Sequence, residues 1–584
     1  MKAYSRFLVV LFTLLFLTAC DLLPLTSQSM PSFTNNQDTP EYLIGQANQQ
    51  SNAEIANQYR LIAADKYIKA NNLEKAQATL GNLQPNLNKT QQMIADMLKA
   101  NIALNKKDTA TALNLLTSNT FYRLDEQETY LQVRVRLLKA TAFETDGKPL
   151  QALRERSYIS SFLSGQTAQD NQDNIWRLAM SIPLEALESA ADGGETGGWL
   201  QLAKAVKSAS TLAEQKENIN QWMAANPNHP AAKNPPAELM TIQSLTTETY
   251  TKVAILLPQK QKYAQAIYNG FIAAYYQADN KDKITIKAYE SSDFKSMDAF
   301  YEQAKKDGMQ LVIGPIEKNF VNELSKKPTL PITTLALNYT DGNSHPPQLF
   351  QFGLLPEDEA REAAIRAFSD GRRHAVAIVP QGEWGKKVLS AFRTQWEQLG
   401  GVIDGIQYID RPVDLDGQMV SLIGKLPGNG IKSTSEDDNM LFMVAEPSIA
   451  RQIRALLVYH DGDKLPVYAT SHIYTGTPDA SQDSDLNGVL FTETPWLLSS
   501  TDPVQQNIIT QWPQAKTSFA RLYALGVDTW RLTPRISELK ALPNSRVEGL
   551  SGELTIDNNQ RVTRKLPWAT FNKGLIQPAP QNAL

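Results

Sequence analysis

The strongest constraint on the fold is a change of pattern near residue 250. Residues 41–230 show apolar positions at helical spacing and almost no strand-like alternation. From Lys252 onward, short apolar runs such as Val253–Leu257 and Ile284–Tyr289 alternate with helical stretches such as 263–277. Strands that alternate with helices of this length form parallel sheets joined by right-handed crossovers. We therefore expect an all-helical half followed by an α/β half.

The α/β half contains two such series. The first predicts strands at 253–257, 284–289, 311–315 and 332–337, with helices at 263–277, 297–307 and 317–326. The second predicts strands at 374–379, 406–409, 440–445 and 467–470, with helices at 384–399 and 447–459. Two series within residues 251–584 predict two doubly wound lobes. The Pro-, Gly- and Ser-rich stretch 411–439 is long for a loop, which suggests a functional insertion.

The helical half carries a repeat. Ala76, Ala112 and Ala152 occupy matching places in three similar segments, each of which follows a polar turn. A small residue at this place lets the second helix of a pair pack closely on the first. The steps of 36 and 40 residues resemble degenerate tetratricopeptide repeats, whose nominal period is about 34 residues. An irregular helical bundle is the alternative, and in either case Trp176, Trp199 and Trp222 are expected in the core.

The first twenty residues resemble a lipoprotein signal. Lys2 and Arg6 precede the apolar run Leu8–Leu17, which is too short to span a hydrocarbon core that needs about 20 residues. The run closes on Leu17-Thr18-Ala19-Cys20, which resembles a lipobox, and Cys20 is the only cysteine in the chain. Cys20 is thus the predicted lipidation site; the alternatives are an ordinary cleaved signal and an apolar N-terminus that is no signal. With Cys20 acylated, no thiol remains for disulfides or metal sites.

These patterns predict five segments along the chain. They are a signal peptide at 1–19, the lipidated cysteine and a flexible tether at 20–40, the helical domain at 41–230, a proline-rich linker at 231–250 and the two-lobed domain at 251–584. The net charge of -4 leaves no electrostatic footprint for nucleic acid.

The sequence offers few signals for an enzyme. The five histidines lack metal-ligand spacing; they are His229, His345, His374, His460 and His472. Gly549-Leu-Ser551-Gly552 departs from the G-x-S-x-G pattern of hydrolases, and Gly314 lies in a turn instead of a phosphate-binding loop. We therefore predict no catalytic residue, no metal and no cofactor.

Four segments of the C-terminal half resemble the type I periplasmic-binding-protein fold in the correct order. They are Val253–Pro258, Leu311–Pro315, Tyr523–Asp528 and Gly549–Asp557 with Arg561 and Val562. In amino-acid-binding proteins of this fold, Ser or Thr residues after the Gly-Pro turn bind a carboxylate. Here Glu317 stands at that place and would repel one, so the resemblance disfavours a small-molecule ligand.

The whole mature chain resembles the penicillin-binding protein activator LpoA family. The most telling segments are Phe352–Ala360, Arg521–Gly526 and Gly549–Gly552. The resemblance implies a non-enzymatic outer-membrane lipoprotein that touches the membrane only through its anchor and stimulates peptide cross-linking by penicillin-binding protein 1A. A lipid-anchored solute-binding protein that serves a transporter is the alternative. Asp21 argues for the inner membrane, because Asp after the lipidated cysteine is a retention signal in many enterobacterial lipoproteins.

Overall fold

The computed structural model describes most of the chain. The described residues are 31–33, 37–190, 192–209, 211–245, 250–278, 284–342, 345–409, 415–428, 438–499, 501–542 and 545–580. Cys20 and most of the predicted tether lie outside them. The chain divides into two compact units, Met1–Gln127 and Glu128–Leu584. Within the described residues, no helix is both long and apolar enough to cross a membrane.

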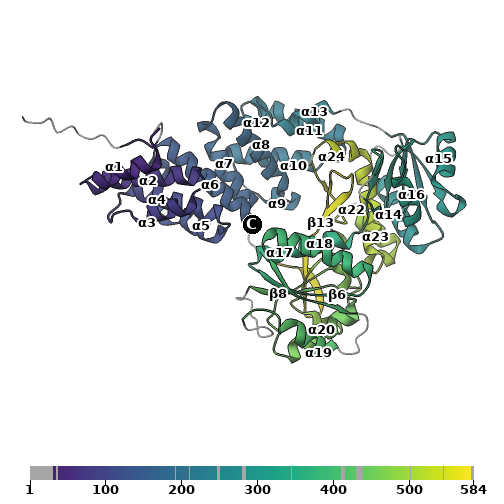
Figure 1. Cartoon of the computed structure of the whole chain (residues 1–584). Coiled ribbons are helices and arrows are strands. Elements are labelled where there is room, and N and C mark those ends of the chain that lie inside the picture. The colour runs from purple at the N-terminus through teal and green to yellow at the C-terminus, as the bar shows by residue number, and fades with distance from the viewer. Residues whose placement is uncertain are drawn as a thin grey trace, which may run out of the picture. The chain divides into compact units, whose positions relative to one another are not determined.

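The first unit is built from helix pairs. Its helices are α1 (Pro40–Gln49), α2 (Ala53–Lys69), α3 (Leu73–Gly81), α4 (Lys89–Asn105) and α5 (Thr109–Leu116), drawn in purple in Figure 1. Asn or Asp side chains accept hydrogen bonds from the first-turn N–H groups of α2 to α5, which explains where these helices begin. Ala76 on α3 and Ala112 on α5 are fully buried, as the repeat predicts.

The second unit begins with more helices. They are α6 (Thr129–Thr145), α7 (Pro149–Ile159), α8 (Gly165–Ser181), α9 (Leu184–Ser189), α10 (Gly194–Lys207) and α11 (Leu212–Ala225). Ala152 on α7 is fully buried at the third repeat position, and Trp176, Trp199 and Trp222 lie in the core as expected. These helices belong to the same compact unit as the α/β half, so the expected helical domain 41–230 is divided at Gln127.

The predicted linker 231–250 is largely helical, and that prediction was wrong. Helices α12 (Pro230–Lys233) and α13 (Ala237–Ser244) occupy it. Pro230 sits in the first turn of α12 and Pro236 caps α13, where a missing N–H costs no helical hydrogen bond. Leu239 and Ile242 are buried in the core of the preceding helices, which fixes α13 to them. The prolines therefore start helices here instead of breaking the chain into a linker.

The first lobe has a five-stranded parallel sheet with the order β2-β1-β3-β4-β5. Its strands are β1 (Lys252–Leu257), β2 (Thr285–Glu290), β3 (Leu311–Ile313), β4 (Thr333–Ala336) and β5 (Leu349–Gln351). Its first three helices are α14 (Lys262–Gln277), α15 (Met297–Lys306) and α16 (Lys318–Ser325). The continuous apolar run of β1 is buried between the helical layers, as parallel strands require.

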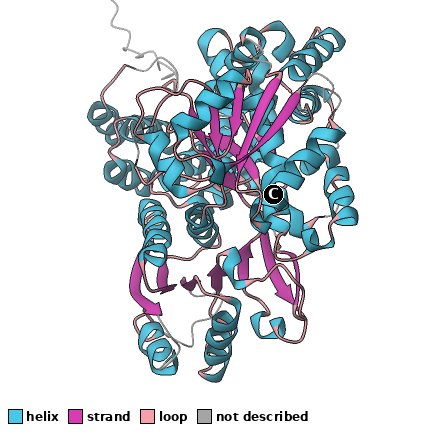
Figure 2. Ribbon diagram, turned by 90° about the vertical axis from the view of Figure 1, so that its right-hand side faces the viewer, coloured by secondary structure: helices cyan, strands magenta, loops and turns pink. Residues whose placement is uncertain are grey.

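The second lobe has a seven-stranded sheet with the order β15-β14-β10-β9-β8-β6-β7, seen apart from the first sheet in Figure 2. The strands are β6 (His374–Pro380), β7 (Val402–Ile409), β8 (Asn439–Met443), β9 (Val467–Ala469), β10 (Leu490–Thr492), β14 (Trp568–Asn572) and β15 (Leu575–Pro578). The helices are α17 (Pro356–Ser369), α18 (Glu383–Leu399), α19 (Leu415–Ile423) and α20 (Pro447–Tyr459).

Stretch 411–439 was predicted as a loop, yet it contains α19. Leu415, Met419, Leu422 and Ile423 follow one helical face and are buried in the core of the second lobe. This apolar face outweighs the loop-like composition around it. Residues 410–414 and 429–437 lie outside the described part of the chain.

The chain passes between the lobes three times. It leaves the first lobe after β5, at residues 352–355, and returns after β10, at residues 493–494. There it adds α21 (Pro495–Leu498), α22 (Pro503–Gln511), α23 (Ala520–Leu532) and α24 (Ile536–Ala541). A three-stranded antiparallel sheet, β11 (Val547–Glu548), β12 (Glu553–Ile556) and β13 (Val562–Lys565), then leads back to β14. We call these three passages the hinge, and the small sheet the hinge sheet.

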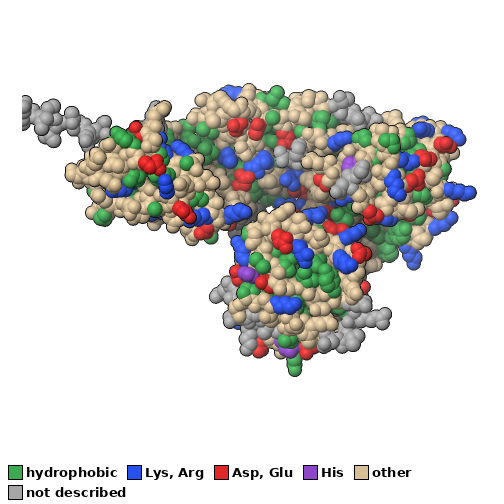
Figure 3. All heavy atoms as spheres, in the orientation of Figure 1, with side chains coloured by type: hydrophobic (Ala, Val, Ile, Leu, Met, Phe, Trp, Pro, Cys, Tyr) green, Lys and Arg blue, Asp and Glu red, His purple; other side chains and the backbone are tan. Residues whose placement is uncertain are grey.

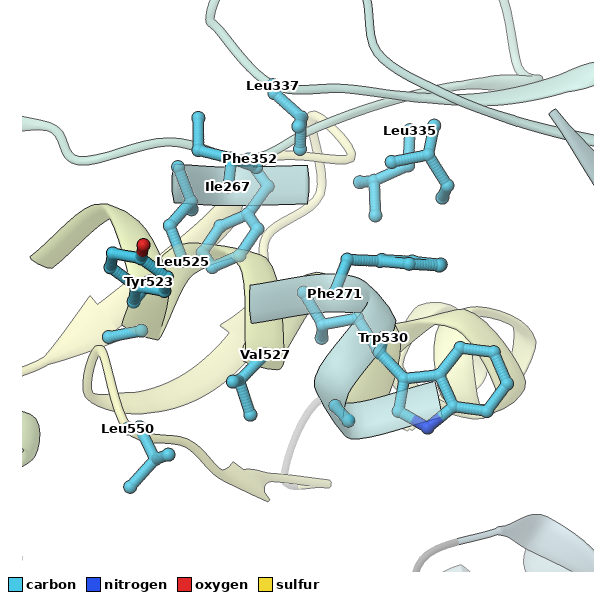
Figure 4. Packing of buried hydrophobic residues seen from close by; sticks show 14 of the residues in the cluster. Ile267, Phe271, Leu335, Leu337, Phe352, Tyr523, Leu525, Val527, Trp530 and Leu550 are labelled. Atoms are coloured by element: carbon cyan, nitrogen blue, oxygen red, sulfur yellow. The ribbon is translucent and has the colours of Figure 1, made fainter. Parts of the chain in front are cut away.

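Two helices far apart in sequence form the centre of the first lobe. Helices α14 and α23 contribute Ile267, Phe271, Tyr523 and Trp530 to one cluster, shown in Figure 4. The rings of Phe271 and Trp530 meet edge to face with centroids 5.5 Å apart. The backbones approach closely because Gly526 lies against the carbonyl of Ile267.

Candidate functional site: a charged pocket at the hinge

The cleft between the lobes contains a cavity of about 140 Å³ at the hinge. It is lined by Leu354, Glu359, Ser471, His472, Glu493, Thr494, Arg521, Arg564 and Leu566. Each of the three hinge passages contributes to this lining, so the cavity changes whenever the lobes move relative to each other. Four of the lining side chains are acidic or strongly basic; Glu359, Glu493 and Arg564 are buried, and Arg521 is 22% exposed.

Glu359 joins the start of α17 to the segment after β9. Its carboxylate accepts the backbone N–H of Ser471 at 2.7 Å and the Ser471 hydroxyl at 3.0 Å. The Arg564 guanidinium lies 4.0 Å from the same carboxylate and donates to the Ser551 carbonyl at 3.2 Å. Glu359 of the second lobe therefore faces a buried guanidinium of the hinge sheet.

Glu493 and Arg521 form the second ion pair. Arg521 projects from α23 of the first lobe, and its guanidinium binds the Glu493 carboxylate through Nε at 3.1 Å and through Nη2. The same guanidinium donates to the carbonyls of Ser471 and Tyr474 in the second lobe, each at 3.2 Å. Arg521 thus makes direct contacts across the cleft.

His472 completes the wall between these pairs. Burial lowers the pKa of its imidazole, although Glu359 and Glu493 act in the opposite direction. Its ring packs on Trp384 of α18 with centroids 4.8 Å apart. A neutral ring is thus favoured beside the two ion pairs.

The pocket offers little space and few acidic groups for binding a ligand. Both carboxylates accept several hydrogen bonds from the protein, and each faces an arginine. A space of about 140 Å³ would hold only a few water molecules. Across the described residues, no group of three or more His, Cys, Asp or Glu side chains could hold a metal ion.

Glu317, at the predicted carboxylate-clamp position, lies outside the pocket lining. Its carboxylate accepts the Ser291 hydroxyl and the backbone N–H of Ile316 at 3.3 Å. Gly314 lies in the turn after β3 with a positive φ of 95°, and an added Cβ would stand 2.1 Å from the Leu256 carbonyl oxygen. The Glu317 carboxylate is therefore engaged within the turn and by Ser291.

The histidines are not brought together. His229 packs between Trp199 and Trp222, His374 binds Asp404 at 3.0 Å, and His460 binds Asp416 at 2.5 Å. Only His472 lines the pocket.

Sequence reasoning did not single out the four pocket charges as a group. Glu359 and Arg521 fall inside segments chosen for their resemblance to a family, whereas Glu493 and Arg564 were not noticed. No spacing rule links these positions, because the three passages of the hinge bring them together.

At the mouth of the cleft, Asp341 of the first lobe pairs with Lys318 at 3.0 Å and with Lys387 of α18 at 3.6 Å. All three side chains are more than two-fifths exposed. Basic and acidic side chains are interspersed elsewhere on the face shown in Figure 3.

Two sheet-centred lobes joined by three passages, preceded by paired helices, define the class: a helical-repeat protein with a type I periplasmic-binding-protein-like body. The model of the LppC putative lipoprotein family matches residues 34–574. The chain is 30% identical over 555 residues to the penicillin-binding protein activator LpoA of Glaesserella parasuis, covering 92% of both chains. It is 28% identical over 549 residues to that of Haemophilus influenzae, again covering 92% of both.

A crystal structure of full-length LpoA from Haemophilus influenzae aligns with a TM-score of 0.52 at 27% identity, covering 93% of this chain and 98% of that one. A monoclinic form of the same protein gives 0.55 at 28% identity, covering 94% and 99%. The chain belongs to the LppC lipoprotein family, with the penicillin-binding protein activators LpoA. The family and the fold class predicted from sequence are confirmed.

Proposed function

We propose that this chain activates the peptidoglycan synthase penicillin-binding protein 1A through protein contacts, raises its rate of peptide cross-linking, and is not an enzyme itself. Relatives that match over nearly the whole length carry the name penicillin-binding protein activator. The observation that carries the proposal is the internal ion pairing of the hinge pocket. A solute-binding protein would hold its ligand in this cleft. Here the charged side chains of the cleft pair with one another, Glu493 with Arg521 and Glu359 with Arg564. The body is therefore suited to docking on a partner.

The solute-binding alternative draws support from the polar lining of the same pocket. A thermal-shift screen of the soluble chain with amino acids and muropeptides separates the two functions. We expect no stabilisation at millimolar ligand, whereas immobilised soluble chain should retain detergent-solubilised penicillin-binding protein 1A. A ligand that raises the melting temperature by several degrees, together with no retention of the synthase, would favour the transporter role.

We propose that Cys20 anchors the chain in the outer membrane. Its position after a short apolar segment supports acylation. The acyl chains would hold in either bilayer, so Asp21 acts only as a sorting address. A synthase in the inner membrane can be reached from the outer membrane by stacked repeats, which extend along one axis.

Membrane fractionation on a density gradient tests both parts of this proposal. We expect the natural chain in the outer-membrane fraction, and Cys20→Ala in the soluble periplasmic fraction without palmitate label. Natural chain in the inner-membrane fraction that moves outward on Asp21→Ser would show that Asp21 governs sorting. Palmitate label on Cys20→Ala would show that Cys20 is not the anchor.

A further inference from the structure

We infer that buried charges at the hinge lock the two lobes at one angle, and that helix α10 holds this lock through Lys207. The inference goes beyond activation of a synthase, because it concerns how the body that docks is kept in one shape. A lobed binding protein ordinarily opens and closes about its hinge. In this chain, two buried ion pairs oppose that motion, and two further contacts hold the hinge sheet and α24 against the helices.

Rotation of the lobes would break the contacts of Arg521. Arg521 belongs to the first lobe, and its partners Glu493, Ser471 and Tyr474 belong to the second lobe or the passage that leaves it. Opening the lobes would draw the guanidinium away from these acceptors. Glu493 is 1% exposed, so it would lose its cation while still surrounded by protein. Separating one partner of a buried ion pair is strongly unfavourable.

The ion pair of Glu359 and Arg564 also joins parts that lobe rotation would separate. Glu359 lies at the start of α17 in the second lobe, and Arg564 lies on β13 of the hinge sheet. Both are buried, and Arg564 also holds the Ser551 carbonyl of the hinge. Any turn of the second lobe against the hinge sheet would therefore separate Glu359 from Arg564. Both ion pairs that resist rotation line the same cavity.

Lys207 connects the hinge sheet to the helices. The Lys207 side chain is fully buried and donates to the carbonyls of Met180 at 3.3 Å and Ile182 at 2.8 Å. Its ammonium also pairs with Glu548 of β11 at 2.7 Å and with Glu553 of β12 at 3.6 Å. One cation thus joins α10 and the end of α8 to two strands of the hinge sheet.

A second buried contact repeats this connection. Gln215 on α11 donates to the Glu538 carboxylate of α24 at 3.2 Å, and Arg535 binds the same carboxylate through two hydrogen bonds of 2.8 and 2.9 Å. Leu542, which follows α24, lies in the core of the helices. The helices are therefore fixed to the first lobe through α24 and to the hinge sheet through Lys207, which restricts the movement of that sheet.

The pair at the cleft mouth serves as an internal control. Asp341 and Lys387 also join the two lobes, but both are more than half exposed. Exposed pairs of this kind contribute little to stability. If the lock resides in the buried hinge, removing Lys387 should leave the lobe angle unchanged.

The experiment measures the distance between the lobes. The chain expressed from Asp21 carries no cysteine, so Glu302→Cys on α15 and Thr394→Cys on α18 place one spin label on each lobe at exposed positions. Double electron–electron resonance should give one narrow distance distribution for this protein. Lys387→Met should leave it narrow.

Two variants should release the lock. Arg521→Met with Glu493→Gln removes both charges together and leaves no unpaired ion, so the fold should survive. Lys207→Met leaves Glu548 partly exposed to water. Both variants should at least double the width of the distribution or add a second distance, with an unchanged circular dichroism spectrum. A broad distribution in the unmodified protein, or narrow distributions in both variants, would overturn the inference.

Discussion

Gly526→Ala is expected to lower the free energy of unfolding by about 3 kcal/mol or more, a cost at the upper end of ordinary overpacking. An added Cβ would stand 2.1 Å from the Ile267 carbonyl oxygen and 2.9 Å from the Phe271 nitrogen. Both are backbone atoms of α14, so no side chain can rotate away. Relief requires α14 and α23 to separate, which would open the core of the first lobe. The intrinsic helix preference of alanine, about 1 kcal/mol over glycine, acts in the opposite direction and cannot compensate.

Urea denaturation of the soluble chain, followed by tryptophan fluorescence, measures this loss. Gly342→Ala is the matched control, because Gly342 is exposed and an added Cβ there meets no atom within 4 Å. It should change the midpoint only slightly. A Gly526→Ala protein as stable as the control would show that the two helices do not pack at this distance.

Asp528→Ala is expected to cost about 3–5 kcal/mol, because it leaves several buried donors without an acceptor at about 1–3 kcal/mol each. The Asp528 carboxylate is fully buried and accepts the backbone N–H groups of Leu550 at 2.8 Å and Ser551 at 2.6 Å, besides the Ser551 hydroxyl. Burial raises the pKa of Asp528, opposed by Arg531 and by these donors. The carboxylate thus attaches the turn between β11 and β12 to α23.

Asp557→Ala is the control for this second prediction. Asp557 also accepts two backbone N–H groups, those of Asn559 at 2.8 Å and Arg561 at 2.9 Å, in a turn next to solvent. Water can replace the lost acceptor there, so we expect about 1 kcal/mol or less. Equal losses in the two variants, measured by the same denaturation, would contradict the account of the buried turn.

The elements that could be predicted from sequence are those with a strong local pattern. The repeat alanines 76, 112 and 152 are all fully buried, and the apolar runs at 253–257 and 374–379 are central strands of the two sheets. Strands β5, β10, β14 and β15 were missed, because no α-helix separates each of them from the strand before it, so the alternation of strands and helices does not mark them. Helix α17 was also missed, although Pro356 at its start and the acidic residues of its first turn are signals of a helix N-terminus.

The contacts of the candidate site could not be predicted from local sequence patterns, because they join residues that are far apart in the sequence. Asp528 and Gly549–Ser551 were both chosen from the sequence as parts of a familiar fold, yet their contact appears only in the structure. An added Cβ on Gly549 would stand 2.4 Å from the Asp528 carboxylate, which explains the glycine in that turn. Glu359, Glu493, Arg521 and Arg564 likewise meet only because the chain passes the hinge three times. Charges separated by such distances in sequence carry no periodicity that could be recognised.

The measurement that tests the proposed function most directly is the rate of peptide cross-linking by purified penicillin-binding protein 1A on lipid II. The soluble chain, added in increasing amounts, is predicted to raise this rate until it saturates, and to form no cross-links without the synthase. Asp557→Ala should activate fully, because the loss of an acceptor next to solvent is expected to leave the fold intact. A cross-linking rate that stays unchanged at saturating concentrations of the chain would contradict the account.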